Sequence, residues 1–285
     1  MLLVDFNQVV ISNFMAQVGR ELDQAGTNLG AGAQQIINSG TGFGQAIAMG
    51  ADLRNIENMS QEDLALPFLK VLGQLSPEVN KAHAKYKVGA EPGMIYNTVS
   101  GQFFDGSKGI DIIPVHYQRQ LVEWQDRGAS TGAPVAIHNA ESDIMSKTTR
   151  DKSYKDRLPN GNYIENTANH FVLMLGDSPT TALISMRATQ LKISRKWNSM
   201  MMGIKLQGKN GMFTPPTYSH IYKLKTVQMS NDKGTWYGWD VSQVGPVSDK
   251  NIYDMAKNFA ERVSAGEIAA KPENQEQPKT DRIVL

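Results

Sequence analysis

The sequence has no cysteine among its 285 residues, which excludes disulfides and thiolate metal sites. It also has no long hydrophobic run, because no window approaches the roughly 18 apolar residues of a membrane span. The first stretch, MLLVDFNQVVISNFMAQVGREL, carries Asp5 and Asn7 and lacks the basic start and unbroken apolar centre of a signal peptide. We therefore expect a cytoplasmic protein that makes no contact with a membrane.

Net charge is nearly absent as well, with 29 Lys and Arg against 28 Asp and Glu. The charges are unevenly placed, however, because the segment 178–231 contains no carboxylate. Solvated faces usually mix both signs, so a single-signed segment favours a polyanionic partner, most commonly nucleic-acid phosphate. A plain solvated surface is the alternative. The cations of this segment are Arg187, Lys192, Arg195, Lys196, Lys205, Lys209, Lys223 and Lys225.

Composition divides the chain into four parts. Residues 1–63 are rich in Gly, Ala and Gln and predict a flexible N-terminal arm. Residues 64–247 carry the apolar runs of a compact domain, and 248–266 have the spacing of a C-terminal helix. The polar segment 267–285 predicts a disordered tail.

Within the compact domain, turn residues separate short apolar runs. MIYNTVSGQFFDG predicts a hairpin turning at Ser100-Gly101, and GIDIIPVHYQRQLVEW predicts a strand with Pro114 at an edge or bulge. HFVLMLGD and TALISMRA predict two further strands. The polar segment 125–168 predicts a long loop whose mixed cations could close over a nucleic-acid strand, with a plain solvated loop as the alternative. These cations are Lys147, Arg150, Lys152, Lys155 and Arg157.

The clearest helix is ATQLKISRKWNSMMMGIKL, which has two distinct faces. Its apolar face contains Ile193, Trp197, Met200, Met201 and Ile204. Its basic face contains Lys192, Arg195, Lys196 and Ser199. A hairpin turning at Asn231 to Gly234 follows, and then a helix over about 249–265 with Ser248 as its N-cap. This order predicts an α+β, mainly β fold: an OB-like antiparallel barrel with an inserted helix, a C-terminal helix and flexible termini. A generic α+β domain would have the same order.

The last hairpin is unusually aromatic. Lys223 and Lys225 share one face of its first strand, and the second strand reads GTWYGWDV. Trp236 and Trp239 fall on opposite strand faces, so we expect one of them to be accessible. Single-stranded bases stack on exposed aromatic rings, whereas core packing is the alternative for any one ring. The candidate stacking residues are Tyr222, Trp236, Tyr237 and Trp239.

Several blocks resemble a family of single-stranded DNA-binding-like proteins of tailed bacteriophages. They are LPFLKVLGQLSPEVNK, PGMIYNTVSGQFFDG, STGAP, and the pattern from Ser194 to Trp239 that includes SRKWNS, FTPP, YKLKTV and SNDKGTWYGW. The resemblance implies DNA binding in phage replication or recombination, in the host cytoplasm, with replication or recombination proteins as partners. The chain departs from the pattern at its end, DRIVL, where such proteins carry an acidic tail.

Two other functions stay open. A structural or assembly role in the virion would suit the Gly/Ala/Gln-rich arm. The first residues also resemble the opening of phage 5′-nucleases, in which Asp5 matches a metal ligand. Such sites need several converging carboxylates, and no acidic cluster follows Asp5. The five histidines are scattered without metal-ligand spacing. We therefore expect no enzyme activity, no cofactor and no metal, with single-stranded DNA as the partner and self-association left open.

Overall fold

The computed structural model describes residues 65–126, 132–232 and 234–272. All described residues belong to one compact unit, Ala65–Leu285. The predicted N-terminal arm and Asp5 therefore lie outside the described residues. No helix in the described part of the chain is long and apolar enough to cross a membrane.

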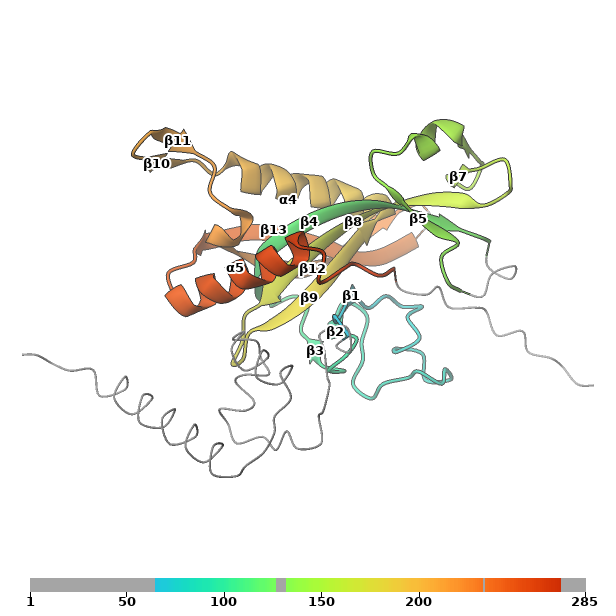
Figure 1. Ribbon diagram of the computed structural model, residues 1–285. Coiled ribbons are helices and arrows are strands. Elements are labelled where there is room, and N and C mark those ends of the chain that lie inside the picture. The colour runs from blue at the N-terminus through green and yellow to red at the C-terminus, as the bar shows by residue number, and fades with distance from the viewer. Residues whose placement is uncertain (1–64, 127–131, 233, 273–285) are drawn as a thin grey trace, which may run out of the picture. The chain divides into compact units, whose positions relative to one another are not determined.

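A curled antiparallel sheet forms a half-barrel at the centre of this unit (Figure 1). Its strands are β4 (Ile110–Trp124), β5 (Ala136–Asn139), β6 (Thr149–Arg150), β7 (Asp156–Arg157), β8 (Tyr163–Met174), β9 (Thr180–Arg187), β12 (His220–Asn231) and β13 (Gly234–Pro246). Across the described residues they pair in the order β13-β12-β4-β8-β7-β6, with β5 against β4 and β9 against β8. The mainly β, α+β class predicted from the sequence is confirmed.

Two long strands of the curled sheet, β4 and β8, each pair with two different strands along one edge. On β8 these partners are β7, near Ile164, and β9, from Thr167 to Met174. β4 pairs with β12 near Ile112 and with β5 near Val122, while its other edge follows β8 throughout. The register between β4 and β8 shifts between Pro114 and His116. A proline cannot donate to the ladder, and a bulge bends the strand that carries it. The predicted bulge at Pro114 is therefore present, although in a central strand.

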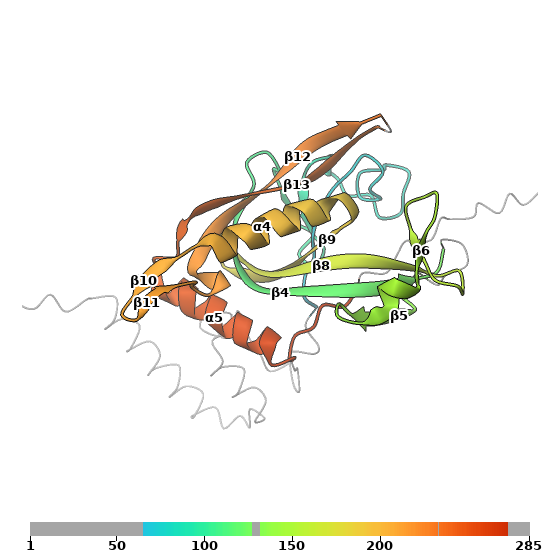
Figure 2. The same cartoon turned by 90° about the horizontal axis from the view of Figure 1, so that it is seen from above.

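Two helices cover opposite faces of the sheet, as Figure 2 shows from above. They are α4 (Leu191–Gly203) and α5 (Lys250–Ser264). A hydrophobic core lies on each face of the sheet. Consecutive residues of β4 point into different cores, because Ile112 packs in the cluster with α4 and Ile113 in the cluster with α5. Trp197 and Met201 are buried on α4, with Ile193 and Met200 packed against the same cluster. The predicted apolar face of this helix is confirmed for these four residues.

A smaller sheet packs against the last hairpin of the half-barrel. It consists of β1 (Leu69–Val71), β2 (Ile95–Asn97) and β3 (Phe103–Phe104). The hairpin predicted around Ser100-Gly101 is the β2–β3 pair. Its flanking loops reach β12, because the Thr226 backbone N–H donates to the Gly106 carbonyl oxygen over 2.9 Å. The Thr226 hydroxyl donates to the Gly93 carbonyl oxygen. This sheet therefore covers part of β12 and β13.

The C-terminal part differs from the prediction in two details. Asp249, rather than Ser248, caps α5, because its carboxylate accepts hydrogen bonds from the backbone N–H groups of Asn251 and Ile252. Ala270 is buried, and its carbonyl oxygen accepts a hydrogen bond from the Gln120 side chain. The beginning of the segment predicted as a tail thus packs against the sheet.

The sheet face beneath α4 contains a buried histidine. The Nε2 atom of His170 lies 2.8 Å from the Ser194 hydroxyl, and its ring stacks on Trp197 with centroids 4.3 Å apart. Burial lowers the pKa of His170 from 6.5 to about 3. The imidazole is therefore neutral in the folded protein at neutral pH, and protonating it opposes folding.

The His170 pKa predicts a loss of stability in mild acid. The unfolded chain binds this proton near pH 6.5 and the folded chain only near pH 3, so its contribution is complete above pH 6.5 and falls as the pH drops. For one proton the free energy of unfolding should decrease by up to about 1.4 kcal/mol per pH unit. Burial also lowers the pKa of His116 and His220, so each adds in the same direction.

Urea denaturation between pH 7 and pH 5 measures this slope above the carboxylate range. The variant His170→Gln keeps a polar side chain but cannot titrate, so its stability should fall less steeply with acid than that of the wild type. Equal slopes for the two proteins would contradict a neutral buried His170.

Candidate nucleic-acid interface

Two of the four predicted stacking residues belong to the core. Tyr222 is 0% exposed and Trp239 is 4% exposed, and both pack in the cluster beneath α4. They share a sheet face with Leu224 and Val241, which are also buried. The alternation expected along this hairpin is therefore present. Because both rings are packed in the core, Tyr222 and Trp239 cannot stack on a base, and we leave them out of the contact surface.

Tyr237 and Gly238 are in contact with other parts of the chain. A Cβ placed on Gly93, which has φ +90°, would lie 2.7 Å from the Tyr237 ring, so this ring lies directly over the glycine. A Cβ placed on Gly238 would lie 2.4 Å from the Gln190 side chain. The side-chain Oε1 atom of Gln190 accepts a hydrogen bond from the Trp239 backbone N–H over 2.9 Å. Gln190 thus fills the space above Gly238 and protects this edge of β13.

Trp236 is the member of the aromatic set on the other strand face. It is partly buried, and it lines a hollow of about 360 Å³. Its indole nitrogen is buried, so the solvent-facing part of the ring is carbon. Such a surface suits stacking against a base. The other residues that line the hollow are Thr189, Asn231, Gly234 and Thr235.

The same hollow adjoins the beginning of α4. Thr189 belongs to the short helix η3 (Ala188–Gln190), which leads directly into α4. No side chain caps the N-terminus of α4, and no acidic residue lies in its first turn. Lys192 and Arg195 stand there instead, exposed to solvent. Cations are unfavourable at the positive end of a helix dipole, whereas an anion is favourable.

The eight cations of the carboxylate-free segment divide into three groups. Three form ion pairs with carboxylates from elsewhere in the chain: Arg187 with Glu165 at 3.0 Å, Lys196 with Asp240 at 3.5 Å, and Lys223 with Asp111 at 2.8 Å. Lys205 donates to the Thr214 hydroxyl. The remaining four make no ion pair with any described residue: Lys192, Arg195, Lys209 and Lys225.

These remaining cations do not form one surface. Lys192 and Arg195 are one turn apart on the exposed side of α4. Lys225 lies on the side of β12 opposite Leu224, and Leu224 packs in the cluster beneath α4. Lys209 lies in a separate hairpin beyond the end of α4. The register of β13 with β12 places Trp236 on the same sheet face as Lys223 and Lys225. Thr189, just before α4, brings the beginning of that helix next to the hollow that Trp236 lines.

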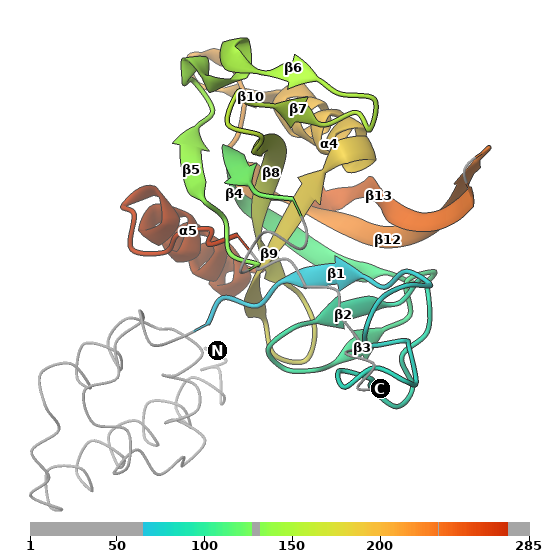
Figure 3. The same cartoon turned by 90° about the vertical axis from the view of Figure 1, so that its right-hand side faces the viewer.

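The segment 132–162 is a structured lobe instead of the predicted long loop. It contains β5, β6, β7 and the short helix η2 (Asp143–Lys147). Figure 3 shows β5, β6 and β7 together at one end of the sheet. Leu158 and Ile164 are buried together with Leu121 of β4, so an apolar cluster anchors the lobe.

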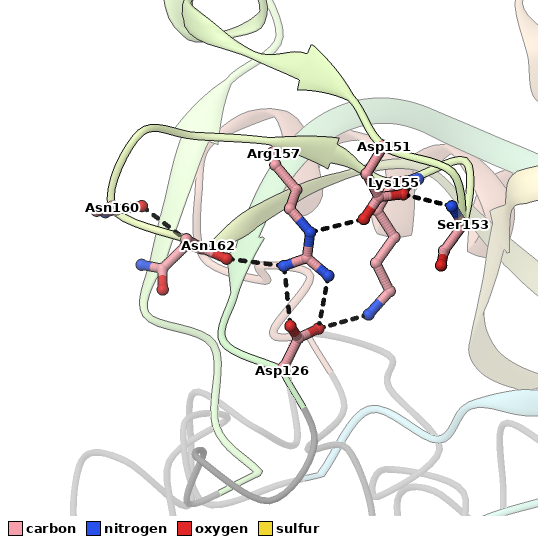
Figure 4. A network of polar contacts seen from close by, with 8 residues as sticks. Asp126, Asp151, Ser153, Lys155, Arg157, Asn160 and Asn162 are labelled. Carbon is pink, nitrogen blue, oxygen red and sulfur yellow. Dashed lines mark hydrogen bonds and ion pairs between the residues drawn. The ribbon is translucent and has the colours of Figure 1, made fainter.

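Ion pairs within this lobe neutralise its cations, as Figure 4 shows. Arg157 lies 2.9 Å from Asp126 and 2.6 Å from Asp151, and Lys155 lies 2.7 Å from Asp126. The Arg157 and Lys155 side chains lower the pKa of Asp126 to about 2. Two further pairs are Arg150 with Asp156 and Lys147 with Asp143. Of the five predicted cations of the lobe, only Lys152 makes no ion pair with a described residue.

Sequence reasoning missed an exposed patch in the middle of β4. Tyr117 is 37% exposed, and its ring centroid lies 5.1 Å from that of the buried His170. Arg119 is exposed and donates from Nε to the Asn166 side chain over 3.0 Å. His170 faces α4, so Tyr117 and Arg119 lie on the α4 side of the sheet. The signal in the sequence is HYQRQ, a polar run inside an otherwise apolar strand.

The Glu123 carboxylate, beside His138, is held by hydrogen bonds to neighbouring side chains. Glu123 accepts hydrogen bonds from Asn162 over 2.6 Å and Asn160 over 3.3 Å, and it lies 2.9 Å from His138 Nε2. The Asn162 hydrogen bond, followed by that of His138, lowers the pKa of Glu123. This carboxylate therefore connects β4, β5 and the turn before β8. Among residues 65–126, 132–232 and 234–272, no three potential metal ligands gather.

Comparison with known families identifies the chain at this point. Residues 39–269 match the model of the Pam3 phage gp34-like protein family. The chain belongs to this family. The match runs from before Ala65 to beyond α5, and so it includes all the strands and helices described above. No curated protein and no solved structure matches the chain.

Membership in the Pam3 phage gp34-like family confirms the bacteriophage part of the resemblance seen in the sequence. The family description names no ligand, reaction or partner. The function of the chain must therefore be argued from its surface.

Proposed function

We propose that this phage protein binds single-stranded DNA, without making or breaking bonds, during DNA replication or recombination in the host cytoplasm. One observation carries the proposal: Thr189 lines the hollow of Trp236, and the uncapped α4 that follows it carries exposed Lys192 and Arg195, which make no ion pair with a described residue. Phosphate would bind the cations and the first turn of α4, and a base would stack on Trp236. A paired duplex offers no free base face for that ring.

The connectivity of the sheet supports the same function. Along β13-β12-β4-β8-β9 the strands are neighbours, and α4 follows β9 and precedes β12. An OB-fold inserts its helix between the third and fourth strands, and it binds oligonucleotides with its sheet face and two of its loops. We infer an OB-like barrel left open between β9 and β13, with Gln190 at the unpaired edge of β13. The lobe and the β12–β13 turn then correspond to the two binding loops.

The exposed pair Tyr117 and Arg119 adds an aromatic ring and a cation on the α4 side of the sheet. An aromatic ring beside a guanidinium is a combination that contacts both bases and phosphates. We therefore include Tyr117 and Arg119 in the contact surface, whereas the predicted cations Lys223, Lys196 and Arg187 are already paired.

Fluorescence anisotropy of a labelled oligo-dT, measured over a series of salt concentrations, tests the proposal. The logarithm of the binding constant should fall linearly with the logarithm of salt, by about 0.7 for each phosphate contacted. Two to four contacts predict a slope of about −1.4 to −2.8. Salt-independent binding, or none at low salt, would contradict the proposal.

Two further assays, co-purification with phage particles and DNA cleavage, distinguish the two alternative functions. A virion component should co-purify with phage particles and leave free oligonucleotides unbound. A nuclease-related protein should cleave DNA in the presence of a divalent metal, and Asp5→Ala should abolish that cleavage.

A further inference from the structure

A small hairpin projects beyond the C-terminal end of α4 (Figures 1 and 2). It consists of β10 (Leu206–Gly208) and β11 (Gly211–Phe213), which pair antiparallel. Lys209 and Asn210 form its turn, and Gly211 has φ +109°. We call residues 205–214 the ribbon.

The ribbon exposes apolar side chains that a projecting element in water would not normally carry. Met212 is 62% exposed, Phe213 47% and Leu206 40%, and Met202 at the end of α4 is 62% exposed. Leu206 and Phe213 are paired across the two strands, so they share one face. The Phe213 ring lies over Gly208, at 3.1 Å from the position of a Cβ on that glycine. Grouped exposed apolar side chains usually mark a binding surface.

The charge of the ribbon restricts its partner. It contains Lys205 and Lys209 and lies inside the segment 178–231, which has no carboxylate. A suitable partner therefore presents flat apolar groups together with negative charge. Single-stranded nucleic acid offers both in every nucleotide, as a base face and a phosphate. Apolar side chains of DNA-binding proteins also insert between bases elsewhere.

The ribbon also continues the surface described above. Lys192, Arg195, Ser199 and Met202 are spaced i, i+3, i+7 and i+10, and all four are exposed along one side of α4. This line runs from the beginning of α4, which follows Thr189 of the Trp236 hollow, to the end of α4 next to the ribbon. A helix of 13 residues spans about 20 Å.

We propose that the ribbon is a second contact for the same single strand, with Phe213 stacking on a base and Lys209 contacting a phosphate. This inference rests on the proposed function, because the strand must first lie along α4. The ribbon therefore lengthens the binding site and contributes only when the oligonucleotide is long enough to reach it.

A length series of labelled oligo-dT tests the ribbon. The variants are Phe213→Ala, Phe213→Trp and the control Leu75→Ala, which truncates another exposed apolar side chain. Phe213→Ala should weaken binding of long oligonucleotides by about 5- to 150-fold and leave short ones unchanged. Phe213→Trp should restore the binding and add fluorescence quenching that appears only with long oligonucleotides.

Other results would separate failure of the ribbon contact from failure of the proposed single-stranded DNA binding. If the wild type binds short and long oligonucleotides and Phe213→Ala binds them equally well, the ribbon is not a contact and the proposed function stands. A change in molecular mass on Phe213→Ala without DNA, measured by sedimentation, would show that the ribbon binds a second copy of the chain and would overturn the inference. No binding by the wild type at any length would reject both.

Discussion

Reversal of the two cations at the beginning of α4, Lys192→Glu with Arg195→Glu, is expected to weaken oligo-dT binding by about 30- to 150-fold at low salt. The loss corresponds to about 2–3 kcal/mol, the contribution of two screened hydrogen bonds to charged groups. Both side chains are exposed and make no ion pair with a described residue, so the reversal breaks no side-chain interaction within the described part of the fold. The salt slope should also become shallower by about 1.4, because two phosphate contacts are removed.

A matched control separates a local contact from general attraction. Lys250→Glu with Lys257→Glu changes the net charge by the same amount on α5, which covers the opposite face of the sheet. This control should bind nearly as the wild type does. If the two double variants lose affinity equally, the attraction comes from the total charge and the α4 site is wrong.

Truncation of the partly buried tryptophan, Trp236→Ala, is expected to weaken oligo-dT binding by about 5- to 150-fold, the range for one lost base stack. The other three tryptophans, Trp124, Trp197 and Trp239, are buried. Quenching by DNA should therefore come from Trp236, and it should disappear in this variant. Salt dependence should remain, because Lys192 and Arg195 are still present.

The conservative variant Trp236→Phe keeps an aromatic face and serves as the control for stacking. It should recover most of the affinity without recovering the quenching. If Trp236→Phe binds as weakly as Trp236→Ala, the role of Trp236 is to support the β12–β13 turn and not to stack on a base.

Local patterns in the sequence predicted much of the fold. The apolar spacing of α4, the turn between β12 and β13, and the bulge at Pro114 each depend on a few neighbouring residues. The N-cap of α5 was misplaced by one residue because Ser248 and Asp249 are both good caps, and only the backbone decides which one is used. The tail was predicted to begin too early, since the burial of Ala270 depends on the distant sheet.

The site could be predicted only in part, because its accessibility depends on residues far apart in the chain. Alternation along β13 separated Trp236 from Trp239 but could not say which face α4 would cover. The carboxylates that neutralise Arg187 and Lys223 come from Glu165 and Asp111, outside the carboxylate-free segment. The ion pairs of Arg157 likewise join segments that the sequence presents as one polar loop.

Titration of the intrinsic tryptophan fluorescence with an unstructured oligo-dT at low salt tests the central claim most directly. The account predicts strong, saturable quenching that weakens as salt is added, because a base stacks on Trp236 while phosphates are held by Lys192 and Arg195. A flat titration at low salt would contradict single-strand binding and would leave the virion role as the better explanation.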